Sequence, residues 1–255
     1  RTMDGWDFEL KPFVKKREFI RFEDIILLED EHIIAVNKPH GISSLSDRES
    51  EINMLGLGRR YLPELQLCHR IDKETTGVLL FAKNPEIYRE MAILFEHREV
   101  VKHYLALVGG HHDFDEQLIE LPIGLSGKGK ARVDHVNGKE GATVISTAEK
   151  FKDYTLVDCF PLTGRMHQIR IHMASLGCPL IGDELYGGKN ILLSELKRRW
   201  KFNRKEEEPT VNDGIMLHAR GLQFTLLEKE YVIVAPLPKK FEAALKILRR
   251  YDAEK

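Results

Sequence analysis

The stretch HRIDKETTGVLLFAK, residues 69 to 83, decides the fold of this chain because it joins a polar turn to a buried strand. Residues 77 to 83 form an apolar run of strand length, and the Asn-Pro pair at 84 and 85 ends it. Asp72 stands in the polar turn just before that run, so its carboxylate can face a cleft at the mouth of the strand. A second interpretation is that Asp72 only closes the turn, because aspartate is a common turn residue.

The flanking segments predict an α+β fold. Upstream, IILLED and EHIIAVNKP are two apolar runs about a charged turn at 29 to 31, which is typical of a β-hairpin. Downstream, apolar residues at helical spacing predict a helix, followed by a strand in KHYLALVGG. The apolar positions of that helix are Ile87, Met91, Leu94 and Phe95.

The remaining chain continues this pattern. ARVDHV, ATVISTAEKF and YTLVDCF predict three strands of antiparallel sheet, and a helix is expected from His167 to Leu176 with Gly177 just beyond its end. Strands at 217–227 and 231–235 precede a last helix that carries Phe241, Leu245 and Leu248. Many meandering strands with few helices favour α+β over a βαβ repeat. The polar stretch 194–213 predicts an inserted loop or helical hairpin.

Composition excludes several classes of protein. The chain has 255 residues, of which 42% are hydrophobic, and its net charge is −1, so it can form its own core and is neither an acidic disordered chain nor a basic tail. Its apolar runs are far shorter than the roughly 20 residues of a membrane helix, and no secretory signal is visible, so no membrane partner is expected. Cys68, Cys159 and Cys178 form no CxxC pair and are expected to be reduced thiols of a cytoplasmic protein.

The neutral total hides local excesses of charge. Residues 124–139 contain four basic residues and one acidic residue, and residues 239–250 contain five and one. Residues 163–172 contain two arginines, two histidines and no acid, which suggests a bound anion or an active-site acid nearby. His167 and His172 are five residues apart, not the four of a helical metal pair, so no metal is expected there.

Two strands carry further candidates. Tyr104 shares a strand face with the small Ala106, which would leave its ring accessible; ordinary aromatic packing is the alternative. His218 and Arg220 share a face of another strand, where His218 is more typical of a hydrogen-bonded structural histidine than of a catalyst.

Five segments in order resemble the RluA-type pseudouridine synthases, which isomerise uridine in ribosomal and transfer RNA. They are EDEHIIAVNKPHGI, HRIDKETTGVLLFAKN, KHYLALVGG, TGRMHQIRIHMASLGCPLIGDELYGG and LHARGLQF, between about Asp24 and Leu237. The resemblance implies a mixed, mainly antiparallel sheet flanked by helices, with a central active-site cleft. We expect an N-terminal extension at 1–20 and a catalytic domain at 21–255 with an insert at about 190–213.

The resemblance also implies roles for single residues. Asp72 corresponds to the catalytic nucleophile, and Arg170 to the arginine that pairs with it. Tyr104 corresponds to the tyrosine that stacks on the target base and is implicated in removing the C5 proton, and Arg70 to the arginine that helps to rearrange the RNA around the flipped uridine. The same motifs mark a further group as substrate-binding residues: His69, Arg165, His167, Gln168 and His218.

This chemistry needs RNA as its partner and no cofactor, and the protein is expected to act as a monomer. An ionised carboxylate near the ribose would break the glycosidic bond, and the base would leave the stack at a cost of a few kcal/mol. Two other classes stay open. An RNA-binding protein that has lost catalysis would show damage at Asp72, Tyr104 or Arg170, which are all intact; a hydrolase would pair Asp72 with Asp183.

The insert offers a hypothesis about RNA binding. Its basic side chains would contact the RNA backbone, or they would form ion pairs within a solvated hairpin with the acidic residues at 206–208. The basic residues are Lys197, Arg198, Arg199, Lys201, Arg204 and Lys205.

Overall fold

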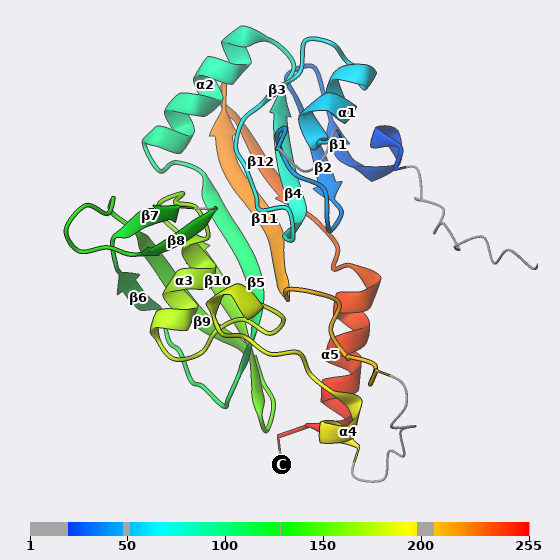
Figure 1. The fold of residues 1–255 in the computed structure, drawn as a ribbon. Helices are drawn as coiled ribbons and strands as arrows, with labels where there is room; N and C mark the ends of the chain where they lie inside the picture. Colours follow the sequence, from blue (N-terminus) through cyan, green and yellow to red (C-terminus); the bar gives the residue numbers. More distant parts are fainter. Residues whose placement is uncertain (1–19, 48–51, 128, 198–206, 255) are drawn as a thin grey trace, which may run out of the picture.

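A ten-stranded mixed sheet runs through the molecule in this computed structural model, which describes residues 20–47, 52–127, 129–197 and 207–254 (Figure 1). The strand order is β1-β2-β4-β11-β5-β10-β9-β6, with β12 paired to β11 and β3 paired to β4. The bounds are β1 Ile26–Glu29, β2 Ile33–Lys38, β3 Gln66–Leu67, β4 Thr76–Ala82, β5 Val101–Gly109, β6 Gln117–Glu120, β9 Ala142–Lys150, β10 Tyr154–Pro161, β11 Leu217–Leu226 and β12 Lys229–Val234.

Helices cover both faces of the sheet. In the N-terminal half, α2 packs on the face that carries Val78 and Leu80 of β4, and α1 packs on the opposite face with Leu79 and Phe81. In the C-terminal half, α5 and α3 cover opposite faces of β5 and β10 in the same way. This alternation follows from the period of two in a strand. The helices are α1 Met54–Tyr61, α2 Pro85–Glu96, α3 Gln168–Ser175, α4 Leu193–Leu196 and α5 Lys239–Tyr251, with short 3-10 turns η1 Phe22–Ile25 and η2 Glu184–Tyr186.

The two halves join where β4 meets β11. These strands pair in parallel at Thr76 with His218 and at Gly77 with Ala219, next to the polar turn that holds Asp72. Gly77 has φ +113°, and a Cβ added there would lie 2.1 Å from the carbonyl oxygen of Ala219. Only glycine permits both this backbone angle and this approach. Tyr104 of β5 packs against the core clusters of both halves, so it also lies at the junction.

Most elements match the sequence predictions. The hairpin of β1 and β2, the buried strand β4, the helices α2, α3 and α5, and the strands β11 and β12 are confirmed. Gly177 follows α3 with φ +76°, as its predicted position requires. Residues 1–19 and 198–206 lie outside the described residues; the predicted extension falls on the first of these ranges, and the middle of the predicted insert falls on the second.

The strand predicted in ARVDHV is confirmed and pairs antiparallel, but it lies apart from the main sheet. ARVDHV contributes β8 (Lys130–Val133), which pairs with β7 (Ile123–Gly127) in a separate two-stranded ribbon and does not extend the main sheet. Helix α1 was not predicted, because its sequence MLGLGRRY contains two glycines. Gly58 leaves room for its neighbours there, since a Cβ would come within 3.2 to 3.3 Å of side-chain atoms of Leu65, Phe22 and Phe81.

The junction yields a stability prediction. Gly77→Ala should lower the free energy of unfolding by about 3 kcal/mol, because the new methyl group meets the β11 backbone and the positive φ strains the residue. Gly109→Ala is the matched control, since a Cβ there meets nothing within 4 Å, and its effect should stay below about 1 kcal/mol. Urea unfolding followed by circular dichroism measures both. Equal stability of the two variants would contradict the close approach of β4 and β11.

Candidate active site

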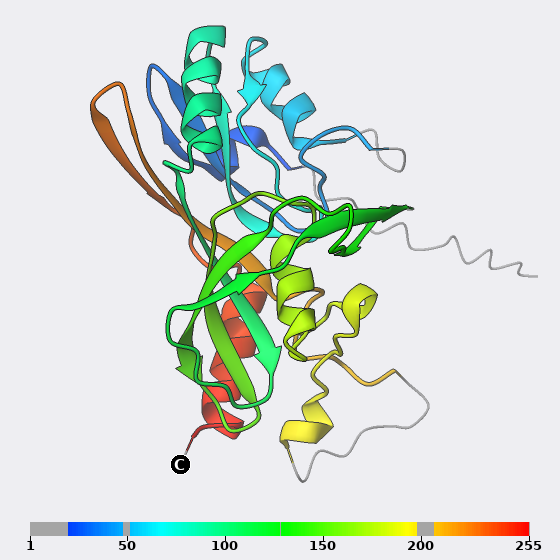
Figure 2. The same ribbon diagram turned by 90° about the vertical axis from the view of Figure 1, so that its left-hand side faces the viewer.

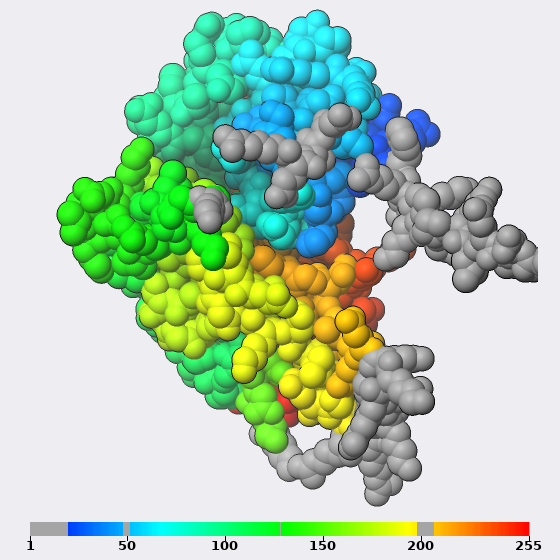
Figure 3. Space-filling view, viewed as in Figure 1, coloured from blue at the N-terminus to red at the C-terminus, as the bar shows by residue number. Residues whose placement is uncertain are grey.

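A basic cleft of about 920 Å³ lies at the junction of the two halves. In the space-filling view of Figure 3, the blue-to-cyan N-terminal part lies above the green-to-yellow part. Burial, followed by the charges of Arg165 and Arg98, lowers the pKa of Lys102 in this cleft to about 8. The charged side chains that line it are six basic ones, Arg59, Arg70, Arg98, Lys102, Arg165 and Arg170, and two acidic ones, Asp72 and Glu96. This excess of positive charge suits a polyanion.

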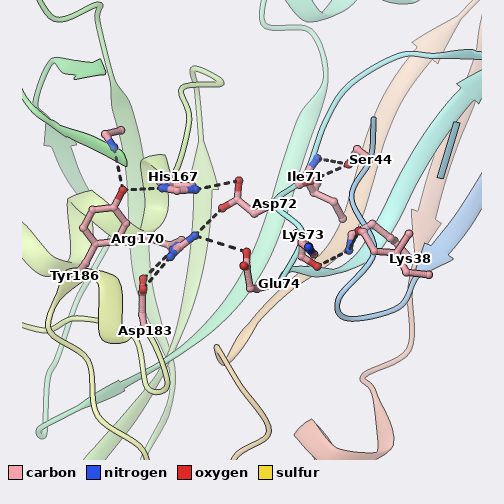
Figure 4. Close-up of polar contacts among 12 residues, drawn as sticks. Lys38, Ser44, Ile71, Asp72, Lys73, Glu74, His167, Arg170, Asp183 and Tyr186 are labelled. Carbon is pink, nitrogen blue, oxygen red and sulfur yellow. Dashed lines mark hydrogen bonds and ion pairs between the residues drawn. The ribbon is translucent and has the colours of Figure 1, made fainter. Parts of the chain in front are cut away.

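The turn that carries Asp72 is held through the backbone of its two neighbours (Figure 4). The hydroxyl of Ser44 donates to the carbonyl of Ile71 at 2.7 Å and accepts from the amide of Ile71 at 3.2 Å. The carbonyl of Lys73 accepts from the ammonium of Lys38 at 3.0 Å and from the amide of Gly41 at 2.9 Å. The Asp72 carboxylate takes no part in this bonding and faces the cleft.

Lys38, which holds the Lys73 carbonyl, is itself buried. Its side chain has no exposed surface, and its ammonium also donates to the carbonyls of Pro39 and Ile42. Burial lowers the pKa of Lys38 to about 7, against the opposing effect of the Glu74 and Asp72 carboxylates. The segment 38–44 therefore fixes the path of the chain on both sides of Asp72.

Arg170 of α3 lies among three carboxylates. Its Nη1 is 3.5 Å from Asp72 Oδ2 and 4.0 Å from Glu74 Oε2, while its Nε and Nη2 donate to both oxygens of Asp183 at 2.8 and 2.9 Å. Burial lowers the pKa of Arg170, but the hydrogen bonds and charge of Asp183, with the charges of Asp72 and Glu74, raise it above its ordinary value. The structure thus places Arg170 next to Asp72, but the closer partner of Arg170 is Asp183.

Asp183 follows α3 in the GDELYGG loop, and its supporting role was not predicted. Its side chain is 1% exposed, and Arg170 occupies both of its oxygens. It therefore cannot serve as the second free carboxylate that a hydrolase with Asp72 would need. The acid-free run at 163–172 was the available signal, because such a run predicts an acid from elsewhere in the chain.

Tyr104 faces the cleft from β5. Burial, followed by the negative charge of Asp72, raises the pKa of its phenol, so the side chain is neutral at pH 7. It pairs across the sheet with Cys159 of β10 and Ala219 of β11, and both neighbours are small. The ring therefore lines the cleft beside Asp72, as its place next to Ala106 led us to expect.

The residues predicted to bind substrate separate into two groups. His69, Arg70, Arg165 and His167 line the cleft. The His69 ring stacks on Phe95, its Nε2 accepts from the amide of Leu80, and burial lowers its pKa to about 3, so it is neutral.

Gln168 and His218 are both buried and hydrogen-bonded within the protein. The side-chain amide of Gln168 lies in the cleft wall, where it accepts from Thr163 and from the Arg165 amide and donates to Ala142 and Thr143, so it shapes that wall. His218 has no exposed surface and lies outside the cleft lining. Its ring nitrogens bond Thr76 and the Ala235 carbonyl, so it joins β4, β11 and the end of β12.

In the described part of the chain, no helix combines the length and apolar composition needed to cross a membrane. Within the same ranges, no three His, Cys, Asp or Glu side chains are arranged to hold a metal ion. His172 bonds Thr143 and the Leu121 carbonyl through its two ring nitrogens.

Known proteins are similar to this chain in sequence and in fold. A model of the RNA pseudouridylate synthase family matches residues 32–175. Ribosomal large subunit pseudouridine synthase C of Vibrio cholerae is 32% identical over 94% of this chain and 74% of its own length. The dual-specificity RNA pseudouridine synthase RluA of the same organism is 31% identical over 90% of this chain and 89% of its own. The solved human RNA pseudouridylate synthase domain containing 4 superposes with a TM-score of 0.70 and 25% identity, over 89% of this chain and 94% of that one.

Fold, cleft and relatives define an RNA pseudouridine synthase, an isomerase that converts uridine in RNA into pseudouridine. The chain belongs to the RluA-type family of these enzymes, which confirms the family expected from its motifs.

The buried ion pair yields a second stability prediction. Asp183→Asn should lower the free energy of unfolding by about 3 kcal/mol, because Arg170 would lose the carboxylate that compensates its burial. The control is Glu149→Gln in the exposed pair with Arg249, which also has two short hydrogen bonds and should change stability by less than about 1 kcal/mol. Urea unfolding at pH 7 measures both. If Asp183→Asn lowered the free energy of unfolding no more than Glu149→Gln does, the buried pair would not be a main support of the site.

Proposed function

We propose that this enzyme isomerises selected uridines of ribosomal or transfer RNA with Asp72 as its nucleophile. The observation that carries the proposal is the Asp72 carboxylate, 3.5 Å from the buried Arg170 guanidinium in a basic cleft that Tyr104 also lines. The names of the two Vibrio relatives, a ribosomal large subunit synthase and a dual-specificity RNA synthase, support this substrate class.

The chemistry assigns a task to each of these side chains. Asp72 attacks C1′ of the ribose or takes the 2′ proton, and the bond from C1′ to N1 of uracil breaks. The detached uracil rotates, C5 bonds to C1′, the C5 proton leaves, and N1 gains a proton. Tyr104 stacks on the base beside the C5 proton, and Arg170 holds its positive charge next to the Asp72 carboxylate. Every atom of the uridine is conserved except for exchange of that hydrogen, so no cofactor takes part.

The base must leave the RNA stack to reach Asp72, at a cost of a few kcal/mol. The positive cleft offsets part of this cost through contacts with phosphates, and Arg70 makes one of these contacts beside the flipped base. The β7–β8 ribbon, which extends from the sheet above α3, is a second candidate for RNA contact (Figure 2). Lys130, Arg132 and Lys139 are exposed on it or just beyond it. The basic residues of the insert stay a prediction, because 198–206 lie outside the described residues.

We further propose that the enzyme acts in the cytoplasm and as a monomer. Cys68, Cys159 and Cys178 are free, which supports a reducing compartment. The groups assigned to the reaction all come from one chain, which supports a monomer as the active form.

Loss of the nucleophile is the decisive test of function. Asp72→Asn should abolish tritium release from ribosomal and transfer RNA transcribed with [5-³H]uridine, because the amide cannot act on the ribose. RNA affinity measured by fluorescence anisotropy should stay within about threefold, since the side chain keeps its shape. Asp213→Asn, an exposed acid paired with Lys240, is the control and should keep full release.

Retained release in Asp72→Asn would show that another group is the nucleophile. If the unaltered protein bound RNA but released no tritium from any RNA offered, the result would favour an RNA-binding protein that has lost catalysis.

Removing one cleft charge tests the RNA path. Arg70→Gln should reduce the slope of log affinity against log salt concentration by roughly 0.7 to 0.9, as expected for one lost phosphate contact. Lys246→Gln on α5, outside the cleft lining, is the control and should leave the slope unchanged. Equal slopes for both variants would remove Arg70 from the path of the RNA backbone.

A further inference from the structure

Tyr186, at the end of η2, joins groups that the proposed reaction does not explain (Figure 4). Its hydroxyl lies 3.1 Å from the backbone nitrogen of Ala131 in β8 and 2.6 Å from Nδ1 of His167. Its ring lies under the Arg170 guanidinium, 5.1 Å from Cζ to the ring centroid. One side chain thus contacts the ribbon, the histidine and the arginine next to Asp72.

The Ala131 amide fixes the direction of one of these two hydrogen bonds. It can only donate, so the Tyr186 hydroxyl accepts there, and the O–H proton of Tyr186 is available for Nδ1 of His167. In the tautomer that accepts this proton at Nδ1, a neutral His167 carries its own proton on Nε2. Nε2 is 4.0 Å from Oδ1 of Asp72, which is longer than a hydrogen bond. Contacts at catalytic groups are often this long before substrate binds.

The backbone of His167 is unusual. It has φ 55° and ψ 25°, in the left-handed region that residues other than glycine rarely adopt. This residue precedes α3, but its side chain makes no capping hydrogen bond to the helix. The imidazole instead contacts Tyr186 and turns toward Asp72. Such a conformation persists only where its surroundings hold it, and it is common at functional sites.

We propose that Tyr186 and His167 are positioning residues for Asp72. The Tyr186 hydroxyl holds His167 in the form with its proton on Nε2, and this N–H orients the Asp72 carboxylate when RNA occupies the cleft. Because the same hydroxyl accepts from the Ala131 amide, the orientation of Tyr186 and His167 also depends on the position of the β7–β8 ribbon. The inference rests on the proposed role of Asp72 as nucleophile.

The charges around His167 agree with a neutral ring. Burial lowers the pKa of its imidazole below the ordinary value, the charge of Asp72 opposes this, and Arg170 lowers it further. The titratable and charged groups that face it are Asp72 and Glu74 from the turn before β4, Arg170 from α3, and Asp183 and Tyr186 from the loop after α3.

Two variants separate the parts of this arrangement. His167→Asn keeps a residue type that tolerates the left-handed backbone and an oxygen that can accept from Tyr186, but it has no N–H at the place of Nε2. Tyr186→Phe keeps the ring under Arg170 and removes the proton that fixes the histidine. Tyr61→Phe, whose hydroxyl bonds Glu29 outside the cleft lining, is the control.

The readouts are the single-turnover rate of tritium release with saturating [5-³H]uridine RNA, its pH profile, and ¹⁵N NMR of the histidine ring. The unaltered enzyme should show His167 protonated on Nε2 alone. His167→Asn and Tyr186→Phe should each lower the rate about tenfold, and RNA affinity and stability should change much less. In Tyr186→Phe, Nδ1 can take up a proton more easily, so the acid limb of the profile should move to higher pH. Tyr61→Phe should change none of these.

A full rate in His167→Asn, or a proton on Nδ1 in the unaltered enzyme, would overturn the inference. So would an unmoved acid limb in Tyr186→Phe. If these results came with an inactive Asp72→Asn, the nucleophile would stand and only the positioning role would fall. An active Asp72→Asn would instead overturn the proposed function itself.

Discussion

The site depends on one buried positive charge. Arg170 has a side chain that is 5% exposed, and a guanidinium in such surroundings must be compensated or it would destabilise the fold by several kcal/mol. Its partners come from separate parts of the chain: Asp183 and Tyr186 from the loop after α3, and Asp72 and Glu74 from the turn before β4. Folding therefore brings these segments together in order to pair the charge, and the cleft forms around that pair.

The groups near the arginine are held to different degrees. Asp183 forms two short hydrogen bonds with Arg170, whereas the Asp72 carboxylate lies 3.5 Å from Arg170 and 4.0 Å from His167 among the described residues. The backbone around Asp72 is nonetheless fixed through Ser44 and Lys38. Buried side-chain nitrogen and oxygen atoms in the described residues all have hydrogen-bond partners. A rigid turn with a loosely engaged carboxylate suits a group that must react, because the reacting atoms are positioned without being bound to the protein.

The place of the cleft follows from the sheet. The parallel contact of β4 with β11 joins the two halves, and the close approach at Gly77 sets the end of β4 beside the turn of Asp72. Tyr104 of β5 reaches the same point because β5 pairs with the edge of β11 opposite to β4. Residues from positions 72, 104 and 170 thus meet although they lie far apart in the chain.

The sequence by itself determined the strands and helices with strong periodicity, the α+β class and the family, and its motifs indicated Asp72, Tyr104 and Arg170, which all line one cleft. These features are local, because apolar period and motif order depend on neighbouring residues. Only the tertiary structure decided that β8 leaves the main sheet, that Gln168 and His218 are fully engaged inside the protein, and that Asp183 is the closest partner of Arg170. The contacts of Gln168, His218 and Asp183 depend on which other groups satisfy a buried polar atom, and the place of β8 depends on which strand pairs with it; sequence spacing specifies neither choice.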